Sequence, residues 1–326
     1  MKHDYYIFKS GRLKRKDNTV FLETIDGERK YLPIESIDSL HLFGEIDLNT
    51  KLLNYLTSYG IIINFYNYYG YYSGSYYPRK QRVSGYLLVN QVQHYLDKEE
   101  RLFLAKQFII SGVFHMVRNL RRYENTKEYI EAINRELSDI DEVSGIPALM
   151  GIEGRIRNVY YSAFNNILKY GFLLNKREKR PPNDPVNALI SFGNSLLYST
   201  VLGEIYKTQL DPTVSYLHEP STRRFSLSLD LSEIFKPLVI DSLIFYTVNN
   251  KILNLEDFDS KEEICLLNEE GKKKFIKEYE KKLSTTIKHR KLKRSVSYRS
   301  FIKLECYKLI KHLIDDELYK PLKAWW

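Results

Sequence analysis

The feature that most limits the fold of this chain is a change in the spacing of its apolar residues near residue 80. Before Pro78, short segments rich in Tyr, Phe, Ile, Val and Thr alternate with turn residues, as β-strands do. Beyond it, apolar residues recur every three or four positions to the end of the chain, which is the spacing of amphipathic helices. The 326 residues therefore predict an α+β fold, with a small N-terminal β-strand domain at residues 1–85 and a larger all-α C-terminal domain at residues 86–326.

Several elements of the N-terminal part can be placed individually. The strands expected there are at residues 4–8, 19–24 and 61–66. Asp26 and Gly27 suit a hairpin turn, because glycine tolerates a positive φ. A short helix is expected among the strands, capped by Asn49 or Thr50.

The second part is expected to be a series of helices. They are predicted at residues 97–122, from residue 126, from residue 147, at residues 188–210 and at about residues 229–249. Asp97 and Asn187 are the expected caps of the first and fourth of these helices. Residues 211–222 contain two prolines and should form a loop, and Pro237 should kink the helix that contains it.

The positive charge of the chain is concentrated in one segment. Lys and Arg total 50 against 41 acidic residues, a net charge of +9, and the segment from Lys272 to Arg294 alone holds 11 basic and 2 acidic residues. This segment accounts for the whole excess, which indicates a footprint for a polyanion such as a phosphate backbone. A solvated helix face followed by a basic loop remains the alternative.

Other features of the sequence exclude several classes of protein. Cys265 and Cys306 are too few for a disulfide framework and form no CxxC pair, which favours the reducing cytoplasm. No P-loop, GxGxxG, GxSxG or HExxH motif occurs, and no Cys/His nucleophile can be placed. No apolar run approaches the roughly 20 residues of a membrane span, so we expect no membrane association.

Glu153 is the first candidate for chemistry. It lies between Gly151 and Gly154 on a predicted helix whose neighbouring residues are apolar, and the glycines leave little side-chain cover around it. The alternative is an ordinary helical glutamate paired with Arg157, four residues further on.

The second and third candidates lie in the loop and helix beyond residue 210. His218 is in the predicted loop, where a single histidine is more often structural. Asp230 and Glu233 are three residues apart and so share one face of a helix. Asp230 has an alternative role as the N-cap or first-turn acid of its own helix.

Taken together, these residues have the composition of a metal site. Carboxylates with a single neutral imidazole suit Mg²⁺ or Mn²⁺, and such an ion can activate a hydroxyl for attack on a phosphodiester. Arg223 and Arg224 lie between His218 and Asp230 and are candidates to hold phosphate oxygens, although ordinary loop arginines are equally consistent with their spacing.

Four segments give the chain a resemblance to a known family. They are YLHEPSTRRFSLSLDLSEIFKP at residues 216–237, GIEG at 151–154, PPNDPVNALISFGNSLLYS at 181–199 and GRLKRKDNTV at 11–20. The first closely resembles the signature of the CRISPR-associated integrase, the subunit that inserts new spacers into CRISPR arrays, and the others look like further segments of that family in the same order. The chain resembles the members found in type I systems.

The resemblance implies a set of site residues. Glu153, His218 and Glu233 match the family's ligands for Mg²⁺ or Mn²⁺, and Glu233 stands where some relatives have Asp. Asp230 matches the neighbouring acid of the catalytic group, for which a supporting role is expected. The contacts expected for nucleic acid come from Arg223, Arg224, Lys288, Arg290, Lys291, Lys293 and Arg294.

The resemblance also implies a reaction and partners. The 3′-hydroxyl of a short double-stranded DNA, the protospacer, would attack a phosphodiester at the edge of a CRISPR repeat, so that no protein nucleophile is needed. The relatives form homodimers through the β domain, and two such dimers clamp a dimer of a small ferredoxin-like adaptation subunit in a heterohexamer. Two alternatives stay open: a metal-dependent nuclease or branched-DNA resolvase that uses water, and a non-catalytic DNA-binding assembly subunit.

Overall fold

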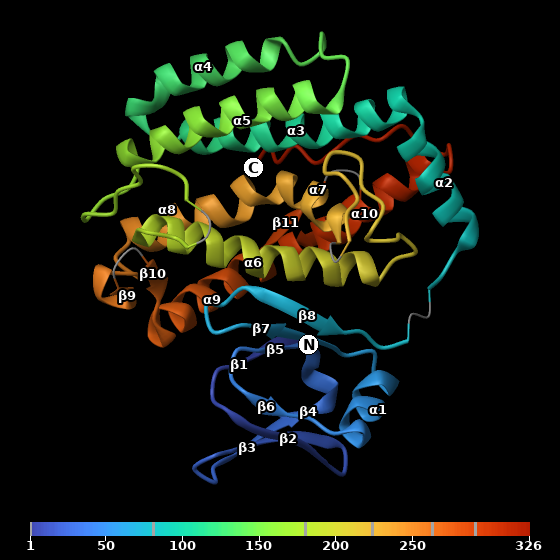
Figure 1. Ribbon diagram of the computed structural model, residues 1–326, viewed down its shortest axis with the longest axis vertical. Helices are drawn as coiled ribbons and strands as arrows, with labels where there is room; N and C mark the ends of the chain where they lie inside the picture. Colours follow the sequence, from blue (N-terminus) through green and yellow to red (C-terminus); the bar gives the residue numbers. More distant parts are fainter. Residues whose placement is uncertain (1, 80–81, 179–180, 223–224, 262–263, 290–291) are drawn as a thin grey trace. The chain divides into compact units, whose positions relative to one another are not determined.

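The computed structural model describes residues 2–79, 82–178, 181–222, 225–261, 264–289 and 292–326 (Figure 1). The chain divides into two compact units, residues 1–81 and 82–326. The first is rich in strands and the second is mainly helical, so the predicted α+β fold class is confirmed.

The first unit contains two four-stranded sheets. One has the strand order β1–β5–β7–β8 and the other β4–β3–β2–β6. Their bounds are β1 His3–Ile7, β2 Gly11–Lys16, β3 Thr19–Thr24, β4 Arg29–Pro33, β5 Ile37–Leu42, β6 Ile46–Asp47, β7 Ile62–Tyr66 and β8 Tyr72–Tyr76. The three predicted strands correspond to β1, β3 and β7.

Local signals in this unit act as the sequence predicts. Gly27 has a φ of +82° in the turn that joins the antiparallel strands β3 and β4. Helix α1 (Thr50–Ser58) is capped by Asn49, whose side chain accepts a hydrogen bond from the Leu52 amide. Aliphatic side chains of both sheets and of α1 form one buried core, which includes Leu13, Val20, Leu22, Leu40, Leu52, Leu56 and Ile63.

The second unit is built from helices and two short hairpins. The helices are α2 Gly85–Leu96, α3 Lys98–Leu120, α4 Lys127–Ser138, α5 Ile146–Ser162, α6 Pro185–Tyr206, α7 Ser226–Phe235, α8 Ser242–Asn249, α9 Glu269–Ser284 and α10 Tyr298–Leu313. The hairpins pair β9 (Phe258–Lys261) with β10 (Ile264–Leu267) and β11 (Thr286–Lys288) with β12 (Ser295–Ser297), and neither of them was predicted. In Figure 1, α3, α4 and α5 run side by side, and α7 packs against both α3 and α6.

Two helix starts illustrate how the caps are chosen. Asp97 caps α3 as predicted, accepting hydrogen bonds from the amides of Glu99 and Glu100 at 2.9 and 3.0 Å. The prediction for α6 was wrong: Asp184 caps it, and Asn187 lies in its first turn. Because proline is favoured in the first turn of a helix, the Asp184-Pro185 pair provides a stronger start than Asn187.

The predicted kink at Pro237 is a π-helical turn. Residues Lys236–Asp241 adopt it between α7 and α8, and α7 begins at Ser226, earlier than expected. Proline has no amide hydrogen to donate, so the regular α-helical ladder cannot continue through this position. The wider turn separates the two ends of the apolar helix and places Lys236 and Asp241 near the site described below.

Helix α7 approaches α3 closely at one glycine. A Cβ atom at Gly112 would lie 2.8 Å from the carbonyl oxygen of Glu233. We expect Gly112→Ala to push the helices apart and to lower the free energy of unfolding by about 1–3 kcal/mol, as overpacking does. Gly154→Ala is the matched control, because nothing lies within 4 Å of its Cβ position. Urea unfolding of both variants measures the free energy of unfolding, and equal values for the two variants would contradict a tight contact at Gly112.

His115 gives the second unit a predictable dependence on pH. The ring is fully buried: Nδ1 donates to the carbonyl oxygen of Ile234 at 2.9 Å, and Nε2 accepts from the amide of Ala324 at 3.0 Å. Burial lowers the pKa of His115 from 6.5 to about 3. The unfolded chain therefore binds a proton at a higher pH than the folded protein does.

The stability that neutral His115 contributes is thus present above pH 6.5 and is lost as the pH falls toward about 3, at about 1.4 kcal/mol per pH unit. Urea unfolding at about pH 7 and about pH 5 should show that His115→Gln loses about 2 kcal/mol less than the unmodified protein between these conditions. The same loss in both proteins would show that His115 is not held neutral.

Candidate functional site

Glu153 lies on α5 and faces a guanidinium one turn further along the helix. Helix α5 begins after Gly145, whose backbone is extended, and has a proline in its first turn. Because the helix continues to Ser162, Glu153 lies in its interior. Arg157 donates from Nε to Oε1 of Glu153, and the Glu153 side chain is 17% exposed. The i to i+4 pair that the sequence offered as the alternative for Glu153 is therefore present.

Arg157 also joins α5 to α7. Its Nη2 donates to Oε2 of Glu233, while Nζ of Lys236 lies 2.6 Å from Oε1 of the same carboxylate. The Glu233 side chain is only 6% exposed. Two of the predicted ligands, Glu153 and Glu233, are thus brought together on one guanidinium, although they are 80 residues apart in sequence.

Two further ionisable groups belong to this cluster and were not predicted. Burial and the charge of Arg157 lower the pKa of Lys236 to about 8. Burial raises the pKa of Asp241 to about 7, and its Oδ2 makes no hydrogen bond with the described residues. Burial alone would lower the pKa of Arg157, but the pKa is raised because the hydrogen bond to Glu153 and the charges of Glu153, Tyr161 and Asp241 together outweigh burial. The position of Lys236 three residues after Glu233 was a signal for its pairing, whereas nothing in the sequence marked Asp241.

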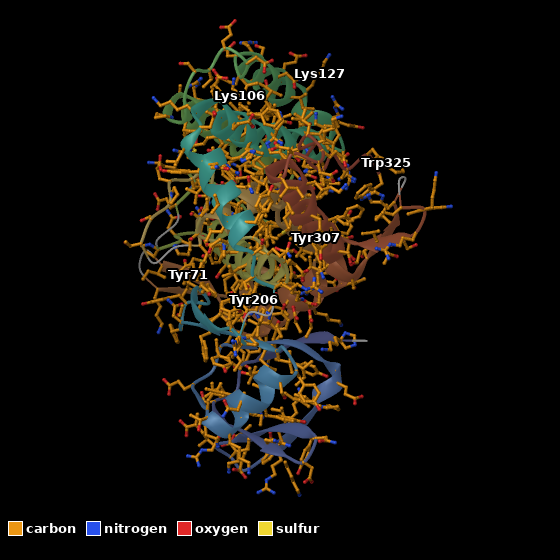
Figure 2. The ribbon with its side chains drawn as sticks, turned by 90° about the vertical axis from the view of Figure 1, so that its right-hand side faces the viewer. Tyr71, Lys106, Lys127, Tyr206, Tyr307 and Trp325 are labelled. Atoms are coloured by element: carbon orange, nitrogen blue, oxygen red, sulfur yellow. The ribbon has the colours of Figure 1, made fainter. Side chains whose placement is uncertain are left out.

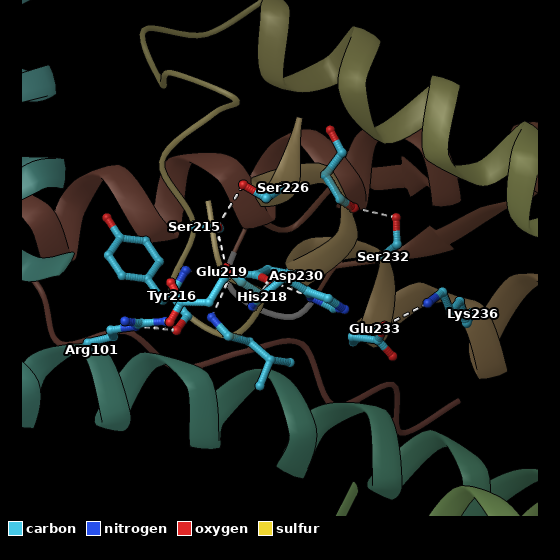
Figure 3. A network of polar contacts seen from close by, with 12 residues as sticks. Arg101, Ser215, Tyr216, His218, Glu219, Ser226, Asp230, Ser232, Glu233 and Lys236 are labelled. Atoms are coloured by element: carbon cyan, nitrogen blue, oxygen red, sulfur yellow. Dashed lines mark hydrogen bonds and ion pairs between the residues drawn. The ribbon is translucent and has the colours of Figure 1, made fainter. Parts of the chain in front are cut away.

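Asp230 holds the loop that carries His218 (Figure 3). Its Oδ2 accepts hydrogen bonds from the amides of Tyr216 and Leu217 at 2.7 and 3.0 Å, and Oδ1 accepts from the amide and Nδ1 of His218 at 2.9 and 2.8 Å. Asp230 is fully buried in the middle of α7, so the alternative that it caps its own helix is wrong. It ties the loop to α7.

These contacts determine which ring nitrogen of His218 can bind a metal ion. Because Nδ1 donates to Asp230, Nε2 is the nitrogen that carries the lone pair. The side chain is 18% exposed, and Nε2 is not engaged by another described residue. Arg101 supports the same loop, since its Nε donates to the carbonyl oxygen of Tyr216 at 2.9 Å and its Nη2 pairs with Glu219 at 2.8 Å (Figure 3).

The residues predicted to contact nucleic acid are only partly described. Arg223, Arg224, Arg290 and Lys291 lie outside the described residues. Lys288, Lys293 and Arg294 are exposed on the β11–β12 hairpin and its turn. The basic segment begins on α9 and ends in this hairpin.

The donor set of Glu153, His218 and Glu233 fits a divalent cation. Two carboxylates that share one guanidinium are two anions that need a positive charge between them, and an imidazole with a fixed tautomer adds a neutral nitrogen donor. The ligand atoms of Glu153, His218 and Glu233 do not all lie within 4.8 Å of one another. Among the described residues, one set of three His, Cys, Asp or Glu side chains has ligand atoms within 4.8 Å of one another, and it is His94, Glu100 and His312.

Comparison with known proteins places the chain among the CRISPR-associated endonucleases. The family model described as CRISPR associated protein Cas1 matches residues 5–281. The chain is 62% identical over 330 residues to the CRISPR-associated endonuclease Cas1 of Clostridium perfringens, with all of both chains covered. The chain therefore belongs to the Cas1 family, and the resemblance seen in its sequence is confirmed.

Solved structures agree with this assignment. The Cas1 protein TM1797 of Thermotoga maritima matches with a TM-score of 0.88 and 43% identity, over 97% of this chain and 99% of that one. A casposase bound to integration product matches with a TM-score of 0.85 over 100% of this chain and 94% of that one, but at 18% identity this likeness concerns the fold alone. In the described part of the chain, no helix is both long and apolar enough to cross a membrane.

Proposed function

We propose that the chain is a metal-dependent DNA integrase that inserts short DNA duplexes into a CRISPR array by transesterification. The observation that carries the proposal is the meeting of Glu153 and Glu233 on one guanidinium, close to a histidine loop that is fixed by the same helix α7. Membership of the Cas1 family supports a role in CRISPR systems. The casposase whose fold is similar was solved with an integration product, which supports a joining reaction.

We propose Glu153, His218 and Glu233 as the ligands of Mg²⁺ or Mn²⁺. Such an ion, when bound, supplies Lewis-acid stabilisation of charge on the oxygens of the phosphodiester. Asp230 holds the imidazole through Nδ1, which leaves Nε2 as the nitrogen that can bind a metal ion. Arg157 must leave the carboxylates when the ion binds, and its guanidinium is then available for a phosphate oxygen.

The proposed reaction needs no nucleophile from the protein. The 3′-oxygen of the incoming DNA forms a bond to the phosphorus at the edge of the repeat, and the bond from that phosphorus to the 3′-oxygen of the flanking nucleotide breaks. The attacking hydroxyl gives its proton to solvent, and the 3′-oxygen that leaves takes up a proton from solvent. Lys236 and Arg157 add positive charge beside the reacting phosphate.

We further propose that the basic hairpin contacts the DNA backbone. Replacing Lys288, Lys293 and Arg294 together by glutamine should weaken binding to all sequences and make the plot of log affinity against log salt shallower by about 2 to 3. The matched control is the triple glutamine variant of Lys98, Lys127 and Arg135, which are exposed on or beside α3 and α4; Lys127 is labelled in Figure 2. Equal slopes for the two triple variants would contradict this role.

The partners are also proposed from the family relationship. Homodimers would form through the β-strand unit, and two such dimers would bind a dimer of a small ferredoxin-like adaptation subunit in a heterohexamer with protospacer DNA. Mass measurement in solution, for the chain alone and mixed with that subunit, tests the assembly. A chain that stays monomeric in both conditions would contradict it.

The product of the reaction tests the function itself. The protein, with and without its adaptation partner, is given a labelled duplex with 3′-hydroxyl ends and a supercoiled plasmid that carries a repeat, in Mn²⁺, Mg²⁺ or EDTA. An integrase joins the label to the plasmid only with metal. Shortened strands without joined label would identify the nuclease or resolvase alternative, and binding without any product would identify an assembly subunit.

A further inference from the structure

A second group of metal-capable side chains lies in the helical unit, on other elements than the site above. It consists of His94 on α2, Glu100 in the first turn of α3 and His312 in the last turn of α10. One ligand atom from each residue lies within 4.8 Å of the others. Helix α2 and the end of α10 pack together, as both ribbon views show, with Tyr307 marking α10 in Figure 2.

His312 is the member of this group that is hardest to explain as an ordinary core residue. Its side chain is 8% exposed, and Nε2 is buried without a hydrogen bond. The nearest carboxylate oxygen, Oε2 of Glu100, is 3.4 Å from Nε2. A buried polar nitrogen without a partner costs free energy, so a native protein that keeps one at this position needs a reason for it.

The other two residues are oriented toward the same point. Nδ1 of His94 pairs with the carbonyl oxygen of Asn90 at 2.9 Å, which makes Nδ1 the donor and leaves the lone pair on Nε2. The rings of His94 and His312 are 5.2 Å apart between centroids. Glu100 is 47% exposed and gives the group one anionic oxygen and a path to solvent.

The electrostatic surroundings also favour a bound cation. The last turn of a helix carries partial negative charge on its free carbonyl groups, and His312 lies in the last turn of α10.

We propose that His94, Glu100 and His312 form a second metal site, which takes a divalent transition metal of the zinc class. Two imidazole nitrogens and one carboxylate oxygen are a donor set for Zn²⁺, Co²⁺ or Ni²⁺ rather than for Mg²⁺, and three protein ligands leave a further position for water. The bound ion links the α2–α3 corner to the end of α10. This proposal does not depend on the proposed DNA reaction.

Cobalt is the probe for the test, because tetrahedral Co²⁺ absorbs in the visible range and its spectrum depends on the ligands that bind it. The full chain is stripped with EDTA, dialysed and titrated with Co²⁺, and Zn²⁺ is then added in competition. We expect one equivalent of Co²⁺ with a visible band that Zn²⁺ abolishes. His94→Gln and Glu100→Gln should each weaken this binding at least tenfold.

The controls separate this site from its surroundings and from the active site. Glu99→Gln changes an exposed carboxylate on the same helical turn as Glu100 and should leave the Co²⁺ affinity unchanged. Glu153→Gln should also leave it unchanged. His312→Ala is left out of the test, because replacing this buried side chain endangers folding. Circular dichroism verifies that His94→Gln and Glu100→Gln fold. The proposal is overturned if no Co²⁺ band appears, if Glu99→Gln weakens binding as much as Glu100→Gln, or if only Glu153→Gln abolishes the band.

Discussion

Replacing Glu153 by glutamine is expected to lower the rate of strand transfer by about 10²–10³-fold or more, the usual cost of removing one group that stabilises charge in a transition state. Glutamine keeps the size of the side chain but removes the negative charge that a divalent ion needs. Arg157 retains Glu233 as a partner, so the contact between α5 and α7 should survive. Strand transfer at saturating Mn²⁺ measures the effect.

The matched control is Glu136→Gln. Glu136 also accepts from an arginine of α5, because its Oε2 lies 2.7 Å from Nε of Arg155, but it lies outside the cluster around Arg157. We expect this variant to keep the activity of the unmodified protein, and both variants to keep their DNA affinity and thermal stability. If Glu153→Gln joins strands normally, Glu153 is only the helical partner of Arg157.

Replacing Asp230 should have the second largest effect, through the loop that it holds. Asp230→Ala removes an acceptor from four hydrogen-bond donors, three of them backbone amides, and should lower the free energy of unfolding by about 3 kcal/mol or more. Asp230→Asn keeps the shape but turns an NH₂ group toward donors. Its imidazole partner is then misoriented, so the Mn²⁺ concentration for half-maximal activity should rise by about 10–100-fold.

A rise in the required Mn²⁺ with partial recovery at high concentration distinguishes a positioning residue from a merely structural one. The control is Asp211→Asn. Asp211 lies at the start of the same loop, and its carboxylate accepts a hydrogen bond from the amide of Thr213 at 2.9 Å. It should leave the Mn²⁺ requirement unchanged. A metal requirement that stays constant in Asp230→Asn would mean that Asp230 does not act through His218.

The sequence contained enough information for the fold class and for part of the site. The change from alternating to helical spacing near residue 80 predicts the two kinds of structure, because each period places apolar side chains on one face. The caps Asn49 and Asp97 were predictable, since their hydrogen bonds reach only two or three residues along the chain. The pair of Glu153 with Arg157 is equally local.

What the sequence could not predict depends on contacts between distant segments. The second bond of Arg157, to Glu233, exists only because α5 and α7 meet in the fold. The sequence left open whether Asp230 is only an acid of its own helix, because the hydrogen bonds that decide this come from a loop 12 to 14 residues earlier. His94 and His312 are isolated in sequence and gave no signal, because packing of α2 against α10 brings them together.

The assignment of Glu153, His218 and Glu233 as ligands is tested most directly by electron spin-echo spectroscopy of Mn²⁺ bound to the protein. The measurement is made in the His94→Gln variant, so that the second site contributes little. We predict a nitrogen coupling from one imidazole, which His218→Gln abolishes and His3→Gln retains. A coupling that persists in His218→Gln, or bound Mn²⁺ without any nitrogen coupling, would contradict the proposed metal site.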